Sequence, residues 1–244
     1  MSKRIITHLS HVDVNMGALI KAWGPYRLIV EVDCHPFQSL ARAIAHQQLN
    51  GVAANTILRR FVSSCGNGVF PTPETVLATP VETLRAAGLS FAKIASLKDL
   101  AGKTLEGIVP ERQALIELQD VEIIERLTQV RGIGRWTVEM LLMFQLGRPD
   151  VLPVDDFGVR NGFRLAYGMR KMPAPRALAA FGERWAPHRT AAAWYLWRAN
   201  DLKRAGTLPA PLERVRLPRL RRLRKIVRNT KAQVRTIRRR LARK

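Results

Sequence analysis

Apolar residues recur at helical spacing through most of the first 206 residues, and this periodicity limits what the chain can fold into. Prolines stand in the expected first turns of several segments, and glycines stand near the ends of others. Strand-like alternation is weak and occurs around residues 27–32. The pattern predicts an all-α body with short connections and helices at 12–23, 37–61 with a break near 50–51, 73–78, 80–86, 91–101, 112–119, 120–127, 137–146, 158–167, 175–185 and 190–201.

The composition excludes several classes of protein. Two cysteines among 244 residues cannot build a disulfide framework, a site of four thiolates or an iron–sulfur cluster held by four thiolates. No apolar run reaches the ~18 residues of a membrane span, and the first residues lack the apolar core of a signal peptide. We therefore expect a protein without a membrane partner that is not secreted, in the cytoplasm or nucleoid, or in the nucleus of a eukaryote. The net charge of +22 makes a polyanion the expected partner.

The positive charge is concentrated at the C-terminus. Residues 207–244 contain 15 Lys or Arg and one acid, Glu213. Apolar residues recur there at helical spacing, and prolines at the junction indicate a linker. We predict a body over 1–206 and a basic extension over 207–244 that becomes helical on DNA. A solvated tail and a helix on an anionic membrane are the alternatives.

The segment 128–146 carries the most specific local pattern. One helix ends at Leu127, a Gly132-Ile133-Gly134 turn follows, and a second helix starts at about Arg135. The N–H groups of a helix's first turn lack intrahelical partners and bind phosphate, and Ile133 would anchor the turn in the core. The pattern favours a helix–hairpin–helix (HhH) element that grips a DNA backbone, with a plain helix–helix turn as the alternative. The expected backbone contacts are Gly132, Ile133, Gly134, Arg135, Trp136 and Thr137.

A Gly/Pro-rich loop over 147–158 brings two carboxylates to the start of the next helix. Asp155 and Asp156 are adjacent there, and an acid at this place is often a helix N-cap. One acid suffices for a cap, so the pair leaves a second carboxylate for chemistry.

The hairpin, the loop and the aspartates, in this order, resemble the HhH–GPD superfamily of DNA glycosylases. Within it the chain is most similar to the 3-methyladenine DNA glycosylase II family, over roughly residues 15–200. Ile44–Ala54 and Trp185–Arg198 resemble further segments of that family. The resemblance implies two small helical subdomains with the active-site cleft between them, and a monomer that acts on double-stranded DNA containing alkylated bases.

The resemblance also implies a reaction. An aspartate stabilises the oxocarbenium-like sugar while the N-glycosidic bond is hydrolysed. The family has an aliphatic residue three positions after this aspartate, which favours Asp156, followed by Val159, with Asp155 as the fallback, a cap or a helper. Related enzymes that cleave the strand carry a lysine where this chain has Trp136, so we expect a monofunctional enzyme without lyase activity. No cofactor is expected apart from a monovalent cation, Na⁺ or K⁺, on the backbone of Thr128, Val130 and Ile133.

The base must leave the stack to be excised. By resemblance Leu49 is the wedge that fills the gap, beside Gln48, although composition alone would place Leu49 in the core. A cationic alkylated purine favours aromatic ring faces. The expected pocket residues are Trp136, Trp197, Phe157, Tyr195, His46 and Met140; His46 could instead cap a helix.

Two other functions stay open at this point. The same scaffold could excise a neutral lesion such as uracil, hypoxanthine or a mismatched base, with Gln48, Asn50 or His46 as hydrogen-bond donors. A non-enzymatic HhH protein could bind DNA structure, but it would gain nothing from two aspartates facing phosphates.

Overall fold

The computed structural model of the chain describes residues 2–49, 51–66, 68–215 and 217. These residues form helices and connecting loops and contain no strand. They divide into two units: one comprises Met1–Arg27 and Leu152–Lys244, and the other comprises Leu28–Val151. None of the described helices is long and apolar enough to cross a membrane.

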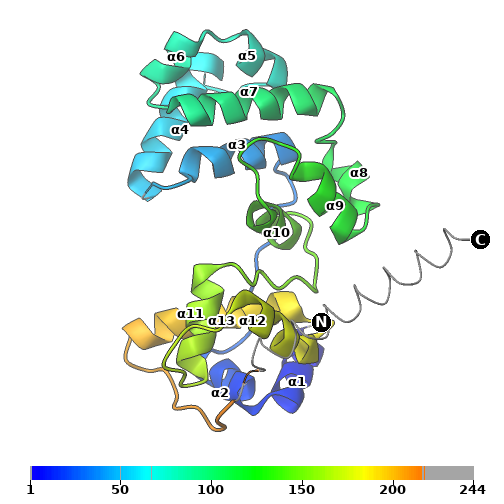
Figure 1. Ribbon diagram of the computed structural model, residues 1–244, viewed down its shortest axis with the longest axis vertical. Coiled ribbons are helices and arrows are strands. Elements are labelled where there is room, and N and C mark those ends of the chain that lie inside the picture. The colour runs from blue at the N-terminus through cyan, green and yellow to red at the C-terminus, as the bar shows by residue number, and fades with distance from the viewer. Residues whose placement is uncertain (1, 50, 67, 216, 218–244) are drawn as a thin grey trace, which may run out of the picture. The chain divides into compact units, whose positions relative to one another are not determined.

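The described residues of the unit formed by Leu28–Val151, here called unit 2, form eight helices. Figure 1 shows α7 running alongside α3, and the short helices α5 and α6 pack against α7 and against α4. Helix α10 packs against α3 and α9. The helices are α3 (Pro36–His46), α4 (Gly51–Gly66), α5 (Pro73–Ala78), α6 (Val81–Ala86), α7 (Phe91–Leu105), α8 (Arg112–Ile116), α9 (Asp120–Leu127) and α10 (Arg135–Phe144).

The other unit, here called unit 1, joins both ends of the chain. Helix α13 packs against α11 and α2 in it, and α1 packs against α2. The approach of α11 to α13 depends on Gly162, because a Cβ at this position would lie 1.8 Å from the carbonyl oxygen of Leu196. Its helices are α1 (Ser2–Val12), α2 (Val14–Trp23), α11 (Phe157–Ala166), α12 (Pro175–Gly182), the short 3-10 helix η1 (Glu183–Trp185) and α13 (Arg189–Arg204).

Most predicted helices are confirmed, and the errors have local causes. The break in 37–61 is a turn over Gln47–Leu49 that separates α3 from α4. Helix α1 is missing from the prediction. The strand-like signal around 27–32 is wrong as a strand: the segment has an irregular backbone, with the Glu31 N–H donating to the carbonyl of Phe144 at 2.7 Å.

The start of the C-terminal extension is attached to unit 1. The buried Asn15 accepts hydrogen bonds from the backbone N–H groups of Leu212 and Glu213 at 2.7 and 3.1 Å, and donates to the Glu213 carbonyl at 2.9 Å. The predicted helix of the extension lies outside the described residues.

Candidate functional site

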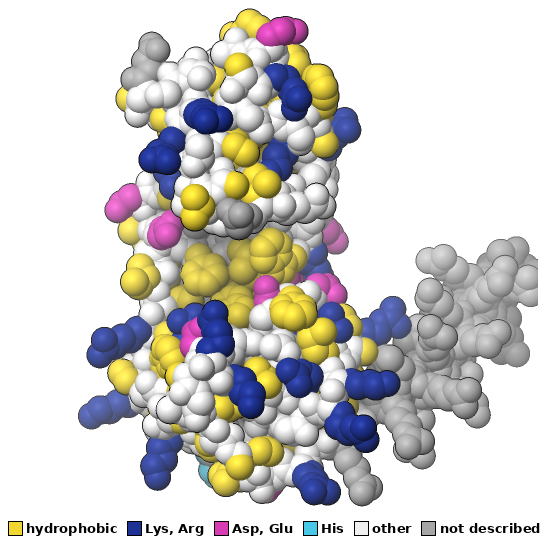
Figure 2. All heavy atoms as spheres, turned by 90° about the vertical axis from the view of Figure 1, so that its left-hand side faces the viewer, with side chains coloured by type: hydrophobic (Ala, Val, Ile, Leu, Met, Phe, Trp, Pro, Cys, Tyr) yellow, Lys and Arg dark blue, Asp and Glu magenta, His cyan; other side chains and the backbone are white. Residues whose placement is uncertain are grey.

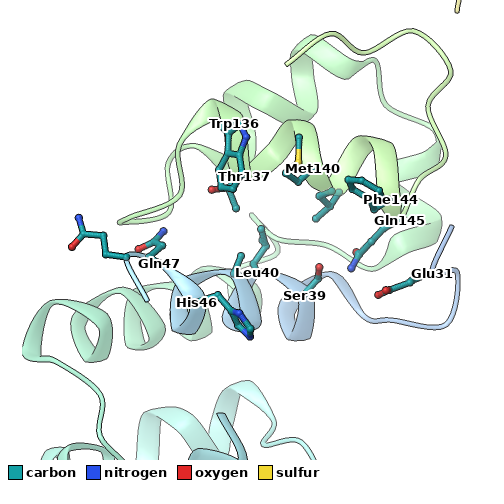
Figure 3. Close-up of a pocket in the computed structure, with 13 residues that line it drawn as sticks. Glu31, Ser39, Leu40, His46, Gln47, Trp136, Thr137, Met140, Phe144 and Gln145 are labelled. Carbon is teal, nitrogen blue, oxygen red and sulfur yellow. The ribbon is translucent and has the colours of Figure 1, made fainter. Parts of the chain in front are cut away.

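Unit 2 contains a pocket of about 460 Å³ between α3 and α10. From α10 it is lined by Trp136, Met140 and Phe144, which are spaced four residues apart and so share one helix face. Figure 2 shows hydrophobic side chains among Lys and Arg side chains on the face in view, and Figure 3 shows the pocket residues. The other lining residues are Glu31, Ser39, Leu40, Ala43, His46, Gln47, Gln48, Thr137, Leu141 and Gln145.

The turn after α3 borders this pocket and is under backbone strain. Gln48 has a φ of +56°. Among the described residues, every other positive φ belongs to a glycine. Such a conformation costs an L-residue roughly 1–2 kcal/mol. The next residue, Leu49, is 40% exposed, so it is not a core residue and is available as a wedge.

The hairpin between α9 and α10 is tightly folded. Gly132 has a φ of +79°, and a Cβ there would lie 2.7 Å from Oγ of Ser96. The Ile133 N–H donates to the carbonyl of Val130 at 3.0 Å, and both side chains are buried. This confirms that Ile133 anchors the hairpin in the core. Helix α10 begins at Arg135, as predicted.

Two side chains from outside the hairpin hold its backbone. Nε2 of Gln47 donates to the carbonyl of Gly132 at 2.8 Å, which ties the strained turn to the hairpin. The Asp99 carboxylate accepts the Arg131 N–H at 2.7 Å, and Nζ of Lys103 donates both to Asp99 and to the Gln129 carbonyl. Partial burial acts to raise the pKa of Asp99, but the Arg131 N–H and the Lys103 ammonium outweigh it and lower that pKa.

Unit 1 holds the carboxylate of Asp156 at the start of α11. Its Oδ1 accepts the Val159 N–H at 2.7 Å and the indole N–H of Trp197 at 2.8 Å. Gly158 makes the second bond possible, because a Cβ at this position would lie 2.7 Å from Cδ1 of Trp197. Two fixed donors and an N-terminal helix end therefore orient this carboxylate. Such a fixed carboxylate can stabilise a cation without reorganising.

Residues 41–188, more than half of the chain, match the family described as HhH-GPD superfamily base excision DNA repair protein. The chain belongs to the HhH-GPD superfamily.

Individual relatives are similar over most of the chain. DNA-3-methyladenine glycosylase 1 of Schizosaccharomyces pombe is 47% identical over 196 residues, which cover 80% of this chain and 86% of that protein. The structure of the S. pombe 3-methyladenine DNA glycosylase Mag1 in complex with abasic DNA has 46% identity and a TM-score of 0.75, covering 82% of this chain and 97% of that one. The structure of DNA-3-methyladenine glycosidase from Bacillus halodurans has 32% identity and a TM-score of 0.75, covering 84% and 94%. These matches confirm the all-α HhH-GPD fold.

Within the HhH-GPD fold, Asp155 and Asp156 do not divide the roles of helix cap and oriented carboxylate as expected. Asp156, and not Asp155, is the N-cap of α11, while Asp155 is exposed. A single carboxylate thus both caps the helix and meets Trp197. The prediction of Asp155 as the cap is wrong, because Oδ1 of Asp156 accepts the Val159 N–H in the first turn of α11.

The aromatic residues expected in the base pocket of the HhH-GPD domain lie in the unit 2 pocket, near Asp156 or in the core of unit 1. Trp136, 45% exposed, lines the unit 2 pocket. Trp197 holds Asp156, and Phe157, 68% exposed, follows that carboxylate. The prediction of Tyr195 as a pocket residue is wrong. Its side chain is fully buried in unit 1, and its hydroxyl donates to the carbonyl of Gly24 at 2.9 Å. Burial, together with the neighbouring Tyr26, raises the pKa of Tyr195 to about 12, as befits a core residue.

Other predicted residues of the HhH-GPD site have these positions. Met140 and Gln48 line the pocket; His46 is the last residue of α3, and Figure 3 shows its ring turned away from Trp136. Arg135 forms an ion pair with the buried Glu139 at 2.8 Å. The prediction that Thr137 contacts a phosphate is wrong, because its side chain is buried and its N–H donates to the carbonyl of Gly134 at 3.0 Å.

The sequence interpretation missed several residues that the HhH-GPD fold brings to this site. Phe144 could have been found from its spacing with Trp136 and Met140 on one helix face. Glu31 had no such signal, because it comes from an irregular segment and reaches the pocket through its bond to Phe144. Asp99 lies 32 residues before Arg131 in the chain, and nothing local connects the two.

Proposed function

We propose that this protein is a DNA glycosylase that flips alkylated bases of the 3-methyladenine and 7-methylguanine type out of double-stranded DNA and removes them by hydrolysis. The named activity of the S. pombe relative supports the substrate class. The observation that carries the proposal is the Asp156 carboxylate, which the Val159 N–H and the Trp197 indole hold at the start of α11, where the resemblance implies the catalytic aspartate.

The chemistry follows from charge. Alkylation at N3 or N7 gives a purine a positive charge, which makes the base a good leaving group. As the N-glycosidic bond breaks, its electron pair leaves with the base and positive charge develops on the sugar, where a carboxylate stabilises it. The cationic base leaves as a neutral molecule, so it needs no strong general acid. Water then adds to the sugar and loses a proton. Trp136 and Phe144 supply ring faces for a cationic base, at roughly 0.5–2 kcal/mol for one such contact.

The enzyme is proposed to hydrolyse the base and leave the strand intact. Strand cleavage by a related route needs an amine that forms a Schiff base. The resemblance puts Trp136 at the position of that amine, and an indole nitrogen cannot form an imine. Incubation with borohydride should therefore trap no covalent protein–DNA adduct, and strand breaks should appear only after alkali.

DNA binding is proposed to use the hairpin and the strained turn. Gly132 and Gly134 of the hairpin and Arg135 in the first turn of α10 are exposed, and together they present donors and a cation to a phosphate. Leu49 would fill the space that the flipped base leaves. A monovalent cation, Na⁺ or K⁺, would be held by the backbone carbonyls of Thr128, Val130 and Ile133. The Val130 carbonyl already accepts the Ile133 N–H, and its second lone pair fits such a ligand.

Asp156→Asn tests the function directly. Purified wild-type protein is incubated with methylated double-stranded DNA, and the released bases are identified by mass spectrometry. Wild type should release 3-methyladenine or 7-methylguanine, and the variant should lose at least about a hundredfold in rate because a neutral amide cannot stabilise the sugar cation. DNA affinity should be retained or increased, since a negative charge is removed.

Asp155→Asn is the matched control and should keep nearly full activity, because this exposed neighbour neither caps α11 nor meets Trp197. Equal losses in both variants would contradict the assignment to Asp156. If wild type releases no methylated base but removes uracil or hypoxanthine, the alkylated-base proposal is wrong and the neutral-lesion function holds.

A further inference from the structure

The pocket of unit 2 has a carboxylate at one end. Glu31 lines the pocket together with Ser39 and Gln145, and Figure 3 shows its side chain extending toward the end that these residues form. The remaining lining side chains are apolar or uncharged apart from the His46 imidazole, and no Lys or Arg is among them. The described lining of the pocket therefore carries a negative formal charge at neutral pH.

A backbone hydrogen bond holds the main chain of Glu31 in place. The Glu31 N–H donates to the carbonyl of Phe144 at 2.7 Å, so the residue is tied to the helix whose aromatic side chains line the same pocket. Among the described residues, no Lys or Arg forms an ion pair with Glu31. Its charge is thus not neutralised by a bonded partner.

Other charged groups lie behind the pocket lining. The guanidinium of Arg112 donates to the Gln145 carbonyl at 3.2 and 3.3 Å, and is engaged there. Burial raises the pKa of the Cys34 thiol, Arg42 opposes this shift and Glu31 adds to it, so Arg42 and Glu31 both lie near that thiol. Neither arginine lines the pocket.

A carboxylate beside aromatic rings suits a cation better than a neutral base. The ring faces of Trp136 and Phe144 attract positive charge, and so does the negative field of the Glu31 carboxylate, which lines the same pocket and is exposed to solvent. An unmodified purine carries no formal charge and gains nothing from this field. A glutamine in place of Glu31 would keep the size and the hydrogen-bonding atoms but lose the charge.

We propose that Glu31 determines the charge specificity of the pocket, so that a base with a formal positive charge binds in preference to the same base without it. This inference rests on the proposed function, because it assumes that the pocket receives the flipped base. Glu31 acts here in selection of the base; stabilisation of the sugar cation stays with Asp156.

The test uses binding, so that turnover does not obscure it. Full-length Asp156→Asn protein is titrated with two duplexes that differ at one base, 7-methylguanine or guanine, at one salt concentration. The ratio of the two dissociation constants measures charge selection, and effects on general DNA affinity cancel in it. Adding Glu31→Gln should lower the preference for 7-methylguanine at least about fivefold. Glu82→Gln, an exposed carboxylate on α6 of the same unit, should leave the ratio unchanged.

Three results would overturn the inference: no preference for 7-methylguanine in the parent variant, the same preference after Glu31→Gln, or an equal loss with Glu82→Gln. Circular dichroism and a melting curve of Glu31→Gln show that the fold is retained. The release of methylated bases by wild-type protein shows whether the proposed function holds, independently of the role of Glu31. Wild-type release together with an unchanged binding ratio rejects the role of Glu31 alone.

Discussion

At the start of α11, the absence of one side chain sets how closely Trp197 approaches Asp156. A Cβ on residue 158 would lie 2.7 Å from Cδ1 and 3.0 Å from Nε1 of Trp197, and 3.1 Å from Oδ1 of Asp156. These are the atoms of the hydrogen bond that orients the carboxylate. Gly158 is thus required by the geometry of the site, although it touches no substrate.

Gly158→Ala should therefore lower the rate of base release by about tenfold or more, equivalent to ~1.4 kcal/mol in the barrier. The new methyl group displaces the indole, while the carboxylate itself remains. Gly102→Ala in α7 is the matched control, because nothing lies within 4 Å of the Cβ it would add and alanine favours a helix. Single-turnover kinetics and thermal melting check both variants. Full activity of Gly158→Ala would show that Trp197 need not hold Asp156.

At the scale of the element, the hairpin is held from outside by polar side chains. Its turn consists of tight backbone bonds, and its position relative to α7 depends on Asp99 and Lys103, which are four residues apart on one face of that helix. On the other side Gln47 reaches the Gly132 carbonyl from the turn that carries Leu49. The proposed phosphate contact and the proposed wedge are therefore connected through one hydrogen bond in unit 2.

Asp99→Asn should lower the free energy of unfolding by about 1 kcal/mol at pH 7, the usual contribution of a hydrogen bond. Because the folded-state pKa of Asp99 is lowered, its stabilisation is present above the ordinary aspartate pKa and is lost as the pH falls through the lowered value. The difference between wild type and variant should thus shrink below about pH 4. Urea unfolding between pH 3 and 7 measures it.

Asp33→Asn, which changes an exposed carboxylate of the same unit, is the control and should give a small difference. A difference between wild type and Asp99→Asn that stays constant down to pH 3 would contradict the role of the ionised carboxylate in holding the hairpin.

At the scale of the whole molecule, the basic extension begins from a fixed point on unit 1. Asn15 holds Leu212 and Glu213, and Pro211 lies against Gly168, where a Cβ would approach its Cγ to 2.8 Å. The 13 Lys and Arg residues of 218–244 follow this anchor. A truncation at 208 would remove the anchor together with the charge, so the informative truncation comes after Leu217.

Removal of residues 218–244 should flatten the salt dependence of DNA affinity. Each lost phosphate contact lowers the slope of log K against log salt by ~0.9, so several contacts would be readily measured. The choice among damaged bases should not change, since phosphate contacts carry no base information. Full-length Asn15→Ala keeps every charge and should keep the slope. An unchanged slope after truncation would mean that the extension does not bind DNA.

The sequence by itself determined most of the helices and the hairpin, because both depend on local information. Helical periodicity, a proline in the first turn and glycines at positive φ act within a few residues of one another. The ends of α5, α9 and the start of α10 agree with prediction for this reason.

The tertiary structure alone decided which side chains meet. Tyr195 and Trp197 are two residues apart on α13, yet one is buried against Gly24 and the other holds Asp156. Glu31 enters the pocket through a bond to Phe144, and Asp99 holds the hairpin from another helix. Such pairs depend on which helix faces pack together and on where a glycine lets them approach, and this is not encoded within a short stretch of the chain.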